Sequence, residues 1–232
     1  MSNFLRILVI ICCLLFCCSK PGNGGSEDSR DIKNSGGQNS SSISGEKDMI
    51  VSTVAMIDEN HFWEIIDKSK KNTKNLDEQE QYLINELINL PQHEIIGFYH
   101  RVNKLILDSY TSNLACAGYL MNGGLTDDGF EYFRLWIISR GKNVYYGALE
   151  NPDILIDEIR GNDNFYEFEA FMYVAANAFK RKTGNNLYDH LDKKIPYSDG
   201  LNYPTIEFSW DENKSESMKS ICPRLFGKFY KK

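Results

Sequence analysis

The sequence predicts an all-α fold, in which a single domain of about seven helices follows a signal peptide and a disordered tether. From residue 49 onward, apolar residues recur at the spacing of helix faces. Capping residues and Gly or Pro stops bracket these segments, and the alternating pattern typical of strands is scarce. Of the 232 residues, 42% are hydrophobic, which is enough for one core of ordinary size.

Residues 1–17 predict a lipoprotein signal peptide. Arg6 precedes an almost unbroken apolar run over residues 7–16, which is shorter than the roughly 20 residues of a permanent span and typical of a signal peptide. The run ends in Leu-Leu-Phe-Cys-Cys-Ser, which resembles a bacterial lipobox. The position before the lipidated residue requires a small side chain, so Cys18 is favoured over Cys17. The alternative is an uncleaved short anchor.

Residues 18–50 predict a disordered tether rich in Ser, Gly and Asn. Such a segment lacks the apolar residues that would offset the entropy of ordering it. A flexible chain of about 30 residues has a typical reach on the order of 30 Å. We therefore expect residues 51–232 to form a helical domain that is held by lipid at the cell membrane or outer membrane, outside the cytoplasm.

The first three helices of this domain are predicted from their caps and apolar faces. Asp58 is expected to cap the first helix and Asn75 the second, which ends at Pro91. The third spans about residues 92–108. Their expected buried residues are Phe62, Trp63, Ile65, Ile66, Leu76, Leu83, Leu87, Leu90, Ile95, Phe98, Val102, Leu105 and Ile106.

The next two helices are predicted to pack closely. A run of small residues, Ala115-Cys116-Ala117-Gly118, lies in a helix over residues 113–121 and lets a neighbour approach. Thr126 is expected to cap a helix over residues 127–140, with Gly141 as a left-handed stop. Apolar side chains cover nearly its whole circumference, so this helix is predicted to lie at the centre of the core.

The remaining elements are predicted less completely. A short helix is expected over residues 144–149, and Asn151-Pro152 opens another in the favoured order of cap and proline. The last long helix is expected over residues 165–182, ending at Gly184. Beyond it we predict loops with one short extended stretch at residues 206–208.

One long stretch resembles a bacterial family known as domain of unknown function 4240. Residues 113–138 read NLACAGYLMNGGLTDDGFEYFRLWII, similar to the family's helix, Gly-Gly turn and Ser/Thr-Asp-Asp-x-Phe-x-x-Phe-Arg-x-Trp helix. Further similar segments are Phe62-Trp63 with Ile66, Ala148-Leu149-Glu150-Asn151-Pro152-Asp153 and Pro223-Arg224-Leu225. The resemblance spans about residues 56–230. It implies the fold but no activity, and the signal peptide and tether depart from its pattern.

The start of the central helix is the first place to look for chemistry. Asp127, Asp128 and Glu131 could form a carboxylate cluster for general base or metal chemistry. Arg134 could grip an anion beside aromatic side chains such as Trp136. The structural alternative is that the acids complement the helix dipole and that Arg134 pairs with one of them, because an unpaired buried charge is costly.

Other residue patterns exclude several site classes. The segment beginning His93-Glu94 has Gly97 where a zinc protease helix needs its second histidine, so we expect no metal and no cofactor. A formal charge of −6 argues against a nucleic-acid partner. Cys116 and Cys222, the two cysteines of the predicted domain, are expected to be free thiols, since no sequence pattern brings them together.

The sequence therefore predicts a lipid-anchored binding or interaction module whose partner, other than the membrane, it does not identify. One alternative is a hydrolase or metal-dependent enzyme built on Asp127, Asp128 and Glu131. Another is an immunity-type protein that neutralises a toxin at the cell surface.

Overall fold

The computed structural model describes residues 56–159, 165–192 and 203–230, which belong to one compact unit of the chain. The predicted signal peptide and tether, including Cys18, lie outside these residues. Within the described part of the chain, no helix has the length and apolar character needed to cross a membrane.

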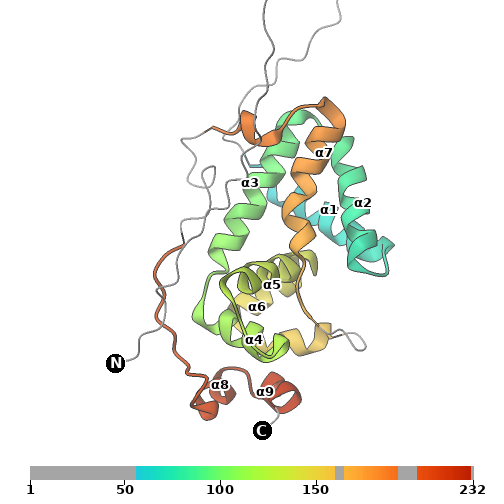
Figure 1. The fold of residues 1–232 in the computed structure, drawn as a ribbon. Helices are drawn as coiled ribbons and strands as arrows, with labels where there is room; N and C mark the ends of the chain where they lie inside the picture. The colour runs from blue at the N-terminus through green and yellow to red at the C-terminus, as the bar shows by residue number, and fades with distance from the viewer. Residues whose placement is uncertain (1–55, 160–164, 193–202, 231–232) are drawn as a thin grey trace, which may run out of the picture. The chain divides into compact units, whose positions relative to one another are not determined.

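The described residues form an all-α structure with no strand among them (Figure 1). The α-helices are α1 (Glu59–Asn72), α2 (Leu76–Ile88), α3 (Gln92–Asp108), α4 (Ser112–Asn122), α5 (Asp127–Ser139), α6 (Lys142–Glu150), α7 (Val174–Thr183), α8 (Ser215–Ile221) and α9 (Pro223–Phe229). The 3₁₀ helices are η1 (Pro152–Glu158), η2 (Glu169–Tyr173) and η3 (Leu187–His190). The all-α prediction is confirmed, but the expected count of about seven helices is too low for the described residues alone.

Several helices begin at the residues that the sequence indicated. Asp58 Oδ1 accepts a hydrogen bond from His61 N at 3.0 Å, and the side chains of Asn75 and Thr126 cap α2 and α5 in the same way. Gly141 has a positive φ of 98°, and a Cβ there would overlap with the Asp67 carboxylate. Only glycine fits this turn between α5 and α6.

The prediction of one long helix over residues 165–182 is wrong for the residues that precede α7. Residues 165–168 are not helical, and η2 precedes α7. Tyr166 N donates to Asn122 Oδ1 at 2.8 Å and Phe168 N donates to Tyr132 O at 3.0 Å, so both amides are used outside a helix. Phe165 is exposed, Tyr166 and Phe168 are buried, and Glu167 between them is half-buried. This alternation is typical of extended backbone.

Helices α8 and α9 lie in a segment that was expected to be loops. Neither has a side-chain cap from its own flanking residues. Instead Asp153 of η1 accepts hydrogen bonds from the backbone amides of Arg224 and Leu225 at 2.9–3.1 Å. The cap of α9 is therefore tertiary, and the local pattern could not reveal it.

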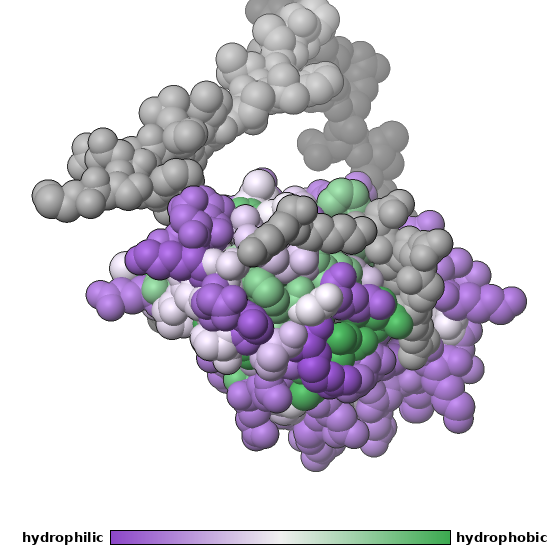
Figure 2. Space-filling model, turned by 90° about the horizontal axis from the view of Figure 1, so that it is seen from below, coloured by the Kyte–Doolittle hydropathy of each residue, from purple (hydrophilic) through white to green (hydrophobic). Residues whose placement is uncertain are grey.

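Helix α5 lies at the centre of the core, as its apolar circumference predicted. It contacts α1, α3, α4, α6 and η2. From Phe133 to Ser139 every residue of α5 is buried, including Arg134. Helices α4, α8 and α9 lie together at one end, where a patch of apolar residues is bordered by hydrophilic ones (Figures 1 and 2).

Candidate functional site

The acids of the predicted cluster do not converge. Asp127 and Asp128 are exposed in the first turn of α5, where negative charge complements the helix dipole. Glu131 is half-buried and accepts a hydrogen bond from Tyr203 Oη at 2.5 Å. Among the described residues, no group of three His, Cys, Asp or Glu side chains is placed to hold a metal ion.

Arg134 is fully buried in the middle of α5, and it does not pair with Asp127 or Asp128. Its Nε donates to Phe130 O at 3.0 Å and its Nη1 donates to Ile106 O at 2.5 Å. No carboxylate oxygen of the described residues lies within 4.0 Å of its guanidinium nitrogens. The expected carboxylate partner is thus replaced by backbone carbonyls.

Three aromatic rings enclose the guanidinium of Arg134. Its Cζ lies 4.5 Å from the ring centre of Phe130, 4.7 Å from that of Tyr203 and 5.0 Å from that of Tyr110. Burial lowers the pKa of Arg134, and the Tyr203 and Glu131 side chains act in the opposite direction. Aromatic rings and backbone carbonyls are the neighbours of this cation, so Arg134 has the surroundings of a structural residue.

A cavity of about 310 Å³ lies near the other end of α5. It is bounded by the end of α1, the start of α2, the C-terminal end of α5 and the segment that precedes η2. Its lining residues are Lys70, Thr73, Lys74, Asn75, Leu76, Gln79, Trp136, Arg140 and Phe165. Trp136, which the sequence singled out, is the one predicted site residue in this lining.

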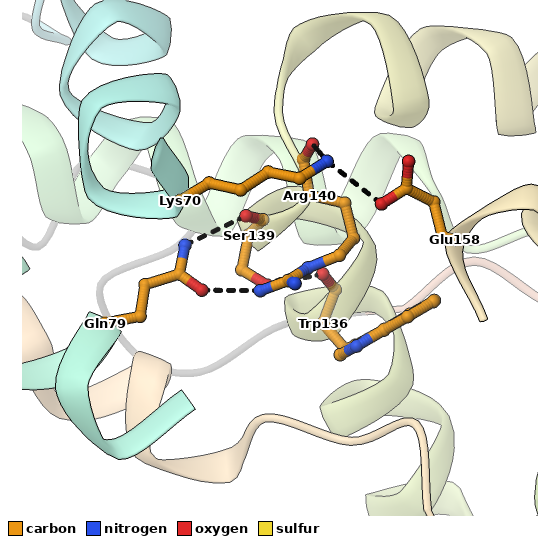
Figure 3. A network of polar contacts seen from close by, with 6 residues as sticks. All are labelled: Lys70, Gln79, Trp136, Ser139, Arg140 and Glu158. Carbon is orange, nitrogen blue, oxygen red and sulfur yellow. Dashed lines mark hydrogen bonds and ion pairs between the residues drawn. The ribbon is translucent and has the colours of Figure 1, made fainter. Parts of the chain in front are cut away.

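Gln79, which lines this cavity, is part of a network of polar contacts (Figure 3). Its side chain is only 1% exposed. Its Nε2 donates to Ser69 Oγ and to Ser139 O, both at 3.0 Å, and its Oε1 accepts from Arg140 Nη2 at 2.5 Å. Because all these bonds are buried or partly buried, Gln79 holds the Arg140 guanidinium in one orientation.

The ammonium of Lys70 joins the backbone of Arg140 to the Glu158 carboxylate. Lys70 Nζ donates to Arg140 O at 2.8 Å and to Glu158 Oε2 at 2.9 Å. Arg140 also donates to Ser139 Oγ at 3.0–3.1 Å, and its Cζ lies 5.9 Å from the Trp136 ring centre. Figure 3 shows this network converging from three separate elements on the end of α5.

The lining combines positive charge with aromatic surface. Among the described residues of the lining, Lys70, Lys74 and Arg140 are cationic, although the whole chain has a formal charge of −6. Lys70 is paired with Glu158, which lies just outside this lining. Phe165 is 65% exposed and Trp136 is buried. Such an arrangement can hold an anionic group together with a flat apolar group.

The sequence prediction missed most of this site. Gln79 is a polar residue between Leu76 and Leu83 on the apolar face of α2, and that placement was the available signal. Nothing in the local sequence marks Arg140 as a site residue, because its partners Gln79 and Lys70 lie 61 and 70 positions away.

Comparison with protein families gives a match over much of the helical domain. The model of a family described as a protein of unknown function (DUF4240) matches residues 57–181. Comparisons with curated proteins and with solved structures gave no match. The matched range includes α1 to η2 and most of α7, and therefore all the residues that line the cavity.

Proposed function

The chain belongs to the DUF4240 family, and on that premise we propose that it is a lipid-anchored, extracytoplasmic binding protein whose cavity takes a small anionic ligand with an aromatic group. The observation that carries the proposal is the lining of the cavity, which is cationic and aromatic in a chain of net negative charge. The family description itself implies no activity.

Charge and size both limit the ligand. Lys70 and Arg140 are fixed by hydrogen bonds before any ligand arrives, so little side-chain entropy is lost on binding. The cavity of about 310 Å³ is at the lower end of the range for small-molecule sites. A monocyclic aromatic phosphate or carboxylate fits this combination of charge and volume.

The lipid anchor rests on residues that precede the family match. The match begins at residue 57, and the predicted tether ends at residue 50. The apolar run, the lipobox-like Cys17-Cys18 and the Ser/Gly/Asn-rich segment are thus features that this chain adds to the family domain. A lipidated Cys18 with a long tether supports a domain that samples solutes near a membrane surface.

Fatty-acid labelling in the producing cell tests the anchor. We expect radiolabelled fatty acid in the wild type and in Cys17→Ala, and none in Cys18→Ala. Because Cys17 and Cys18 are neighbours of the same kind, Cys17→Ala is the matched control. Labelling of Cys18→Ala at the wild-type level would contradict the assignment.

Calorimetric titration with phenyl phosphate tests the ligand class. We expect saturable binding that weakens with added salt, and no binding of benzyltrimethylammonium, which carries the same ring with the opposite charge. Lys74→Gln removes one exposed lining charge and should weaken phenyl phosphate binding about fivefold, which corresponds to roughly 1 kcal/mol.

The matched control is Lys104→Gln. Lys104 is also a surface lysine, but it lies on α3 and pairs with Asp108 away from the cavity lining. Its removal should leave the affinity unchanged. Equal binding of both ring compounds, or equal weakening by both substitutions, would contradict an anion site in this cavity.

A further inference from the structure

The structure brings together the two cysteines of the helical domain, although no sequence pattern pairs them. Cys116 lies in α4, and Cys222 lies between α8 and α9; both are free thiols and completely buried. Cys116 Sγ lies 3.9 Å from Met218 O, and the same carbonyl accepts a hydrogen bond from Cys222 N at 2.9 Å. Both cysteines are therefore positioned around one backbone carbonyl.

Packing on both sides fixes this juxtaposition. The neighbours of Cys116 in α4 are Ala115 and Ala117, both fully buried, and their small size lets α8 and α9 approach closely. On the other side, the buried Asp153 carboxylate holds the first amides of α9 at 2.9–3.1 Å. Cys222 therefore has little freedom to move away from α4.

We propose that Cys116 and Cys222 form a disulfide when the chain folds outside the cytoplasm. The inference rests on the extracytoplasmic location proposed above, because a disulfide persists in an oxidising compartment and is rare in the cytosol. The two positions are more than a hundred residues apart in the sequence, so the bond would tie the C-terminal helices to the middle of the family domain.

The chemistry is ordinary thiol–disulfide exchange with a disulfide oxidant, such as glutathione disulfide or an exposed protein disulfide. One cysteine thiolate attacks the oxidant's S–S bond and forms a mixed disulfide, releasing one thiolate. The second cysteine then attacks the mixed disulfide, forming the Cys116–Cys222 bond and releasing the other. The oxidant disulfide gains two electrons. Its two thiolates take up the two protons that the cysteines lose, so it ends as two thiols.

The fold determines when this bond can form. The hydrogen bond with the Cys116 thiol, together with burial, raises the pKa of the Cys222 thiol, so its reactive thiolate is scarce in the folded chain. Both sulfur atoms belong to fully buried residues that an oxidant does not reach. Closure is therefore expected while the chain folds, before α8 and α9 seal against α4.

Peptide mapping after refolding tests the proposal on the full chain in detergent. Reduced, unfolded protein is refolded with a mixture of oxidised and reduced glutathione, alkylated and digested with trypsin without reduction. The expected product is the peptide 105–134, which contains Cys116, joined to the peptide 220–224, which contains Cys222. A parallel sample, folded under reductant before it meets the oxidant, should form the link at least tenfold more slowly.

Two variants separate a covalent link from a purely structural effect. Cys116→Ala and Cys222→Ala should both lack the joined peptides. The melting temperature of the refolded wild type should fall when reductant is added, whereas that of either variant should not respond. A variant that is merely less well packed would melt lower under both conditions.

The inference is overturned if the refolded wild type yields no joined 105–134 and 220–224 peptides. It is also overturned if the melting temperature is the same with and without reductant. This measurement uses purified protein, so it does not depend on where the chain resides. If the wild type incorporates no fatty-acid label, the proposed extracytoplasmic location is contradicted. The refolding experiment then still decides whether the two cysteines pair.

Discussion

Arg134 lies in the middle of α5 and Arg140 caps its C-terminal end six positions later, and the two cations have different surroundings. Arg134 is surrounded by three rings and two backbone carbonyls. Arg140 is held by side chains from other elements and lines a cavity. Two arginines of one helix can therefore have different surroundings, which depend on the side chains and backbone groups that other elements bring to them.

The largest effect is expected from removing the structural cation. Arg134→Ala deletes a large, fully buried side chain and its hydrogen bonds to the carbonyls of Phe130 and Ile106, so the free energy of unfolding should fall by about 3–5 kcal/mol. Arg134→Met keeps most of the volume and should lose less. Urea denaturation of both variants measures the difference, and an Arg134→Ala protein within about 1 kcal/mol of the wild type would contradict the structural role.

Tyr203→Phe tests which part of the enclosure around Arg134 matters. It keeps the ring over the guanidinium but removes the hydroxyl that donates to Glu131, and it should lower stability by about 1–2 kcal/mol at neutral pH. Denaturation of the variant beside the wild type at pH 7 gives this value. A loss as large as that of Arg134→Ala would contradict the separation of ring and hydroxyl.

The same variant makes a prediction in alkali. Burial raises the pKa of Tyr203, so above about pH 10 the unfolded chain releases a proton that the folded chain retains. Wild-type stability should therefore fall as pH rises beyond 10, and Tyr203→Phe should show a shallower decline. Denaturation at pH 8 and pH 10.5 measures the two slopes.

Arg140→Gln should separate the roles of the two arginines most clearly. It leaves Gln79 Oε1 without the guanidinium, with an expected loss of about 1 kcal/mol in stability, but it should also weaken phenyl phosphate binding. Arg134→Met should leave that affinity unchanged. Calorimetric titration with phenyl phosphate and denaturation curves of both variants measure the two effects. Similar phenyl phosphate affinities for Arg140→Gln and Arg134→Met would contradict separate roles for the two arginines.

The smallest effect is expected at the exposed start of α5. Asp127→Asn removes one charge that complements the helix dipole, so stability should fall by no more than about 0.5 kcal/mol. Thermal denaturation at low ionic strength measures it best, since salt screens the dipole. A stabilised Asp127→Asn protein would instead indicate a strained, charge-crowded site at this position.

The sequence predicted the parts of the fold that local chemistry determines. Asp58, Asn75 and Thr126 cap their helices through their own side chains, and the apolar circumference of α5 placed it at the centre. Helix α9 escaped prediction because its cap, Asp153, comes from another element. The extended residues 165–168 escaped because their amides bond to Asn122 and Tyr132 rather than to one another.

The candidate site was harder to predict than the fold, for the same physical reason. The Asp127–Asp128 pair is conspicuous in the sequence, yet its side chains are directed to solvent. Lys70, Gln79 and Arg140 are unremarkable singly and form a network only because α1, α2 and α5 meet. A site assembled from distant residues leaves no spacing pattern in the chain.

The tertiary cap of α9 also limits where this chain can be shortened. The family match ends at residue 181, but Asp153 within the match is 5% exposed and has its hydrogen-bond donors at residues 224 and 225. A protein cut at the end of the match would leave that carboxylate without those donors and uncover the apolar residues beneath α8 and α9. The boundary of sequence similarity is therefore not a boundary of autonomous folding, and expression of residues 57–181 alone should give an aggregation-prone product.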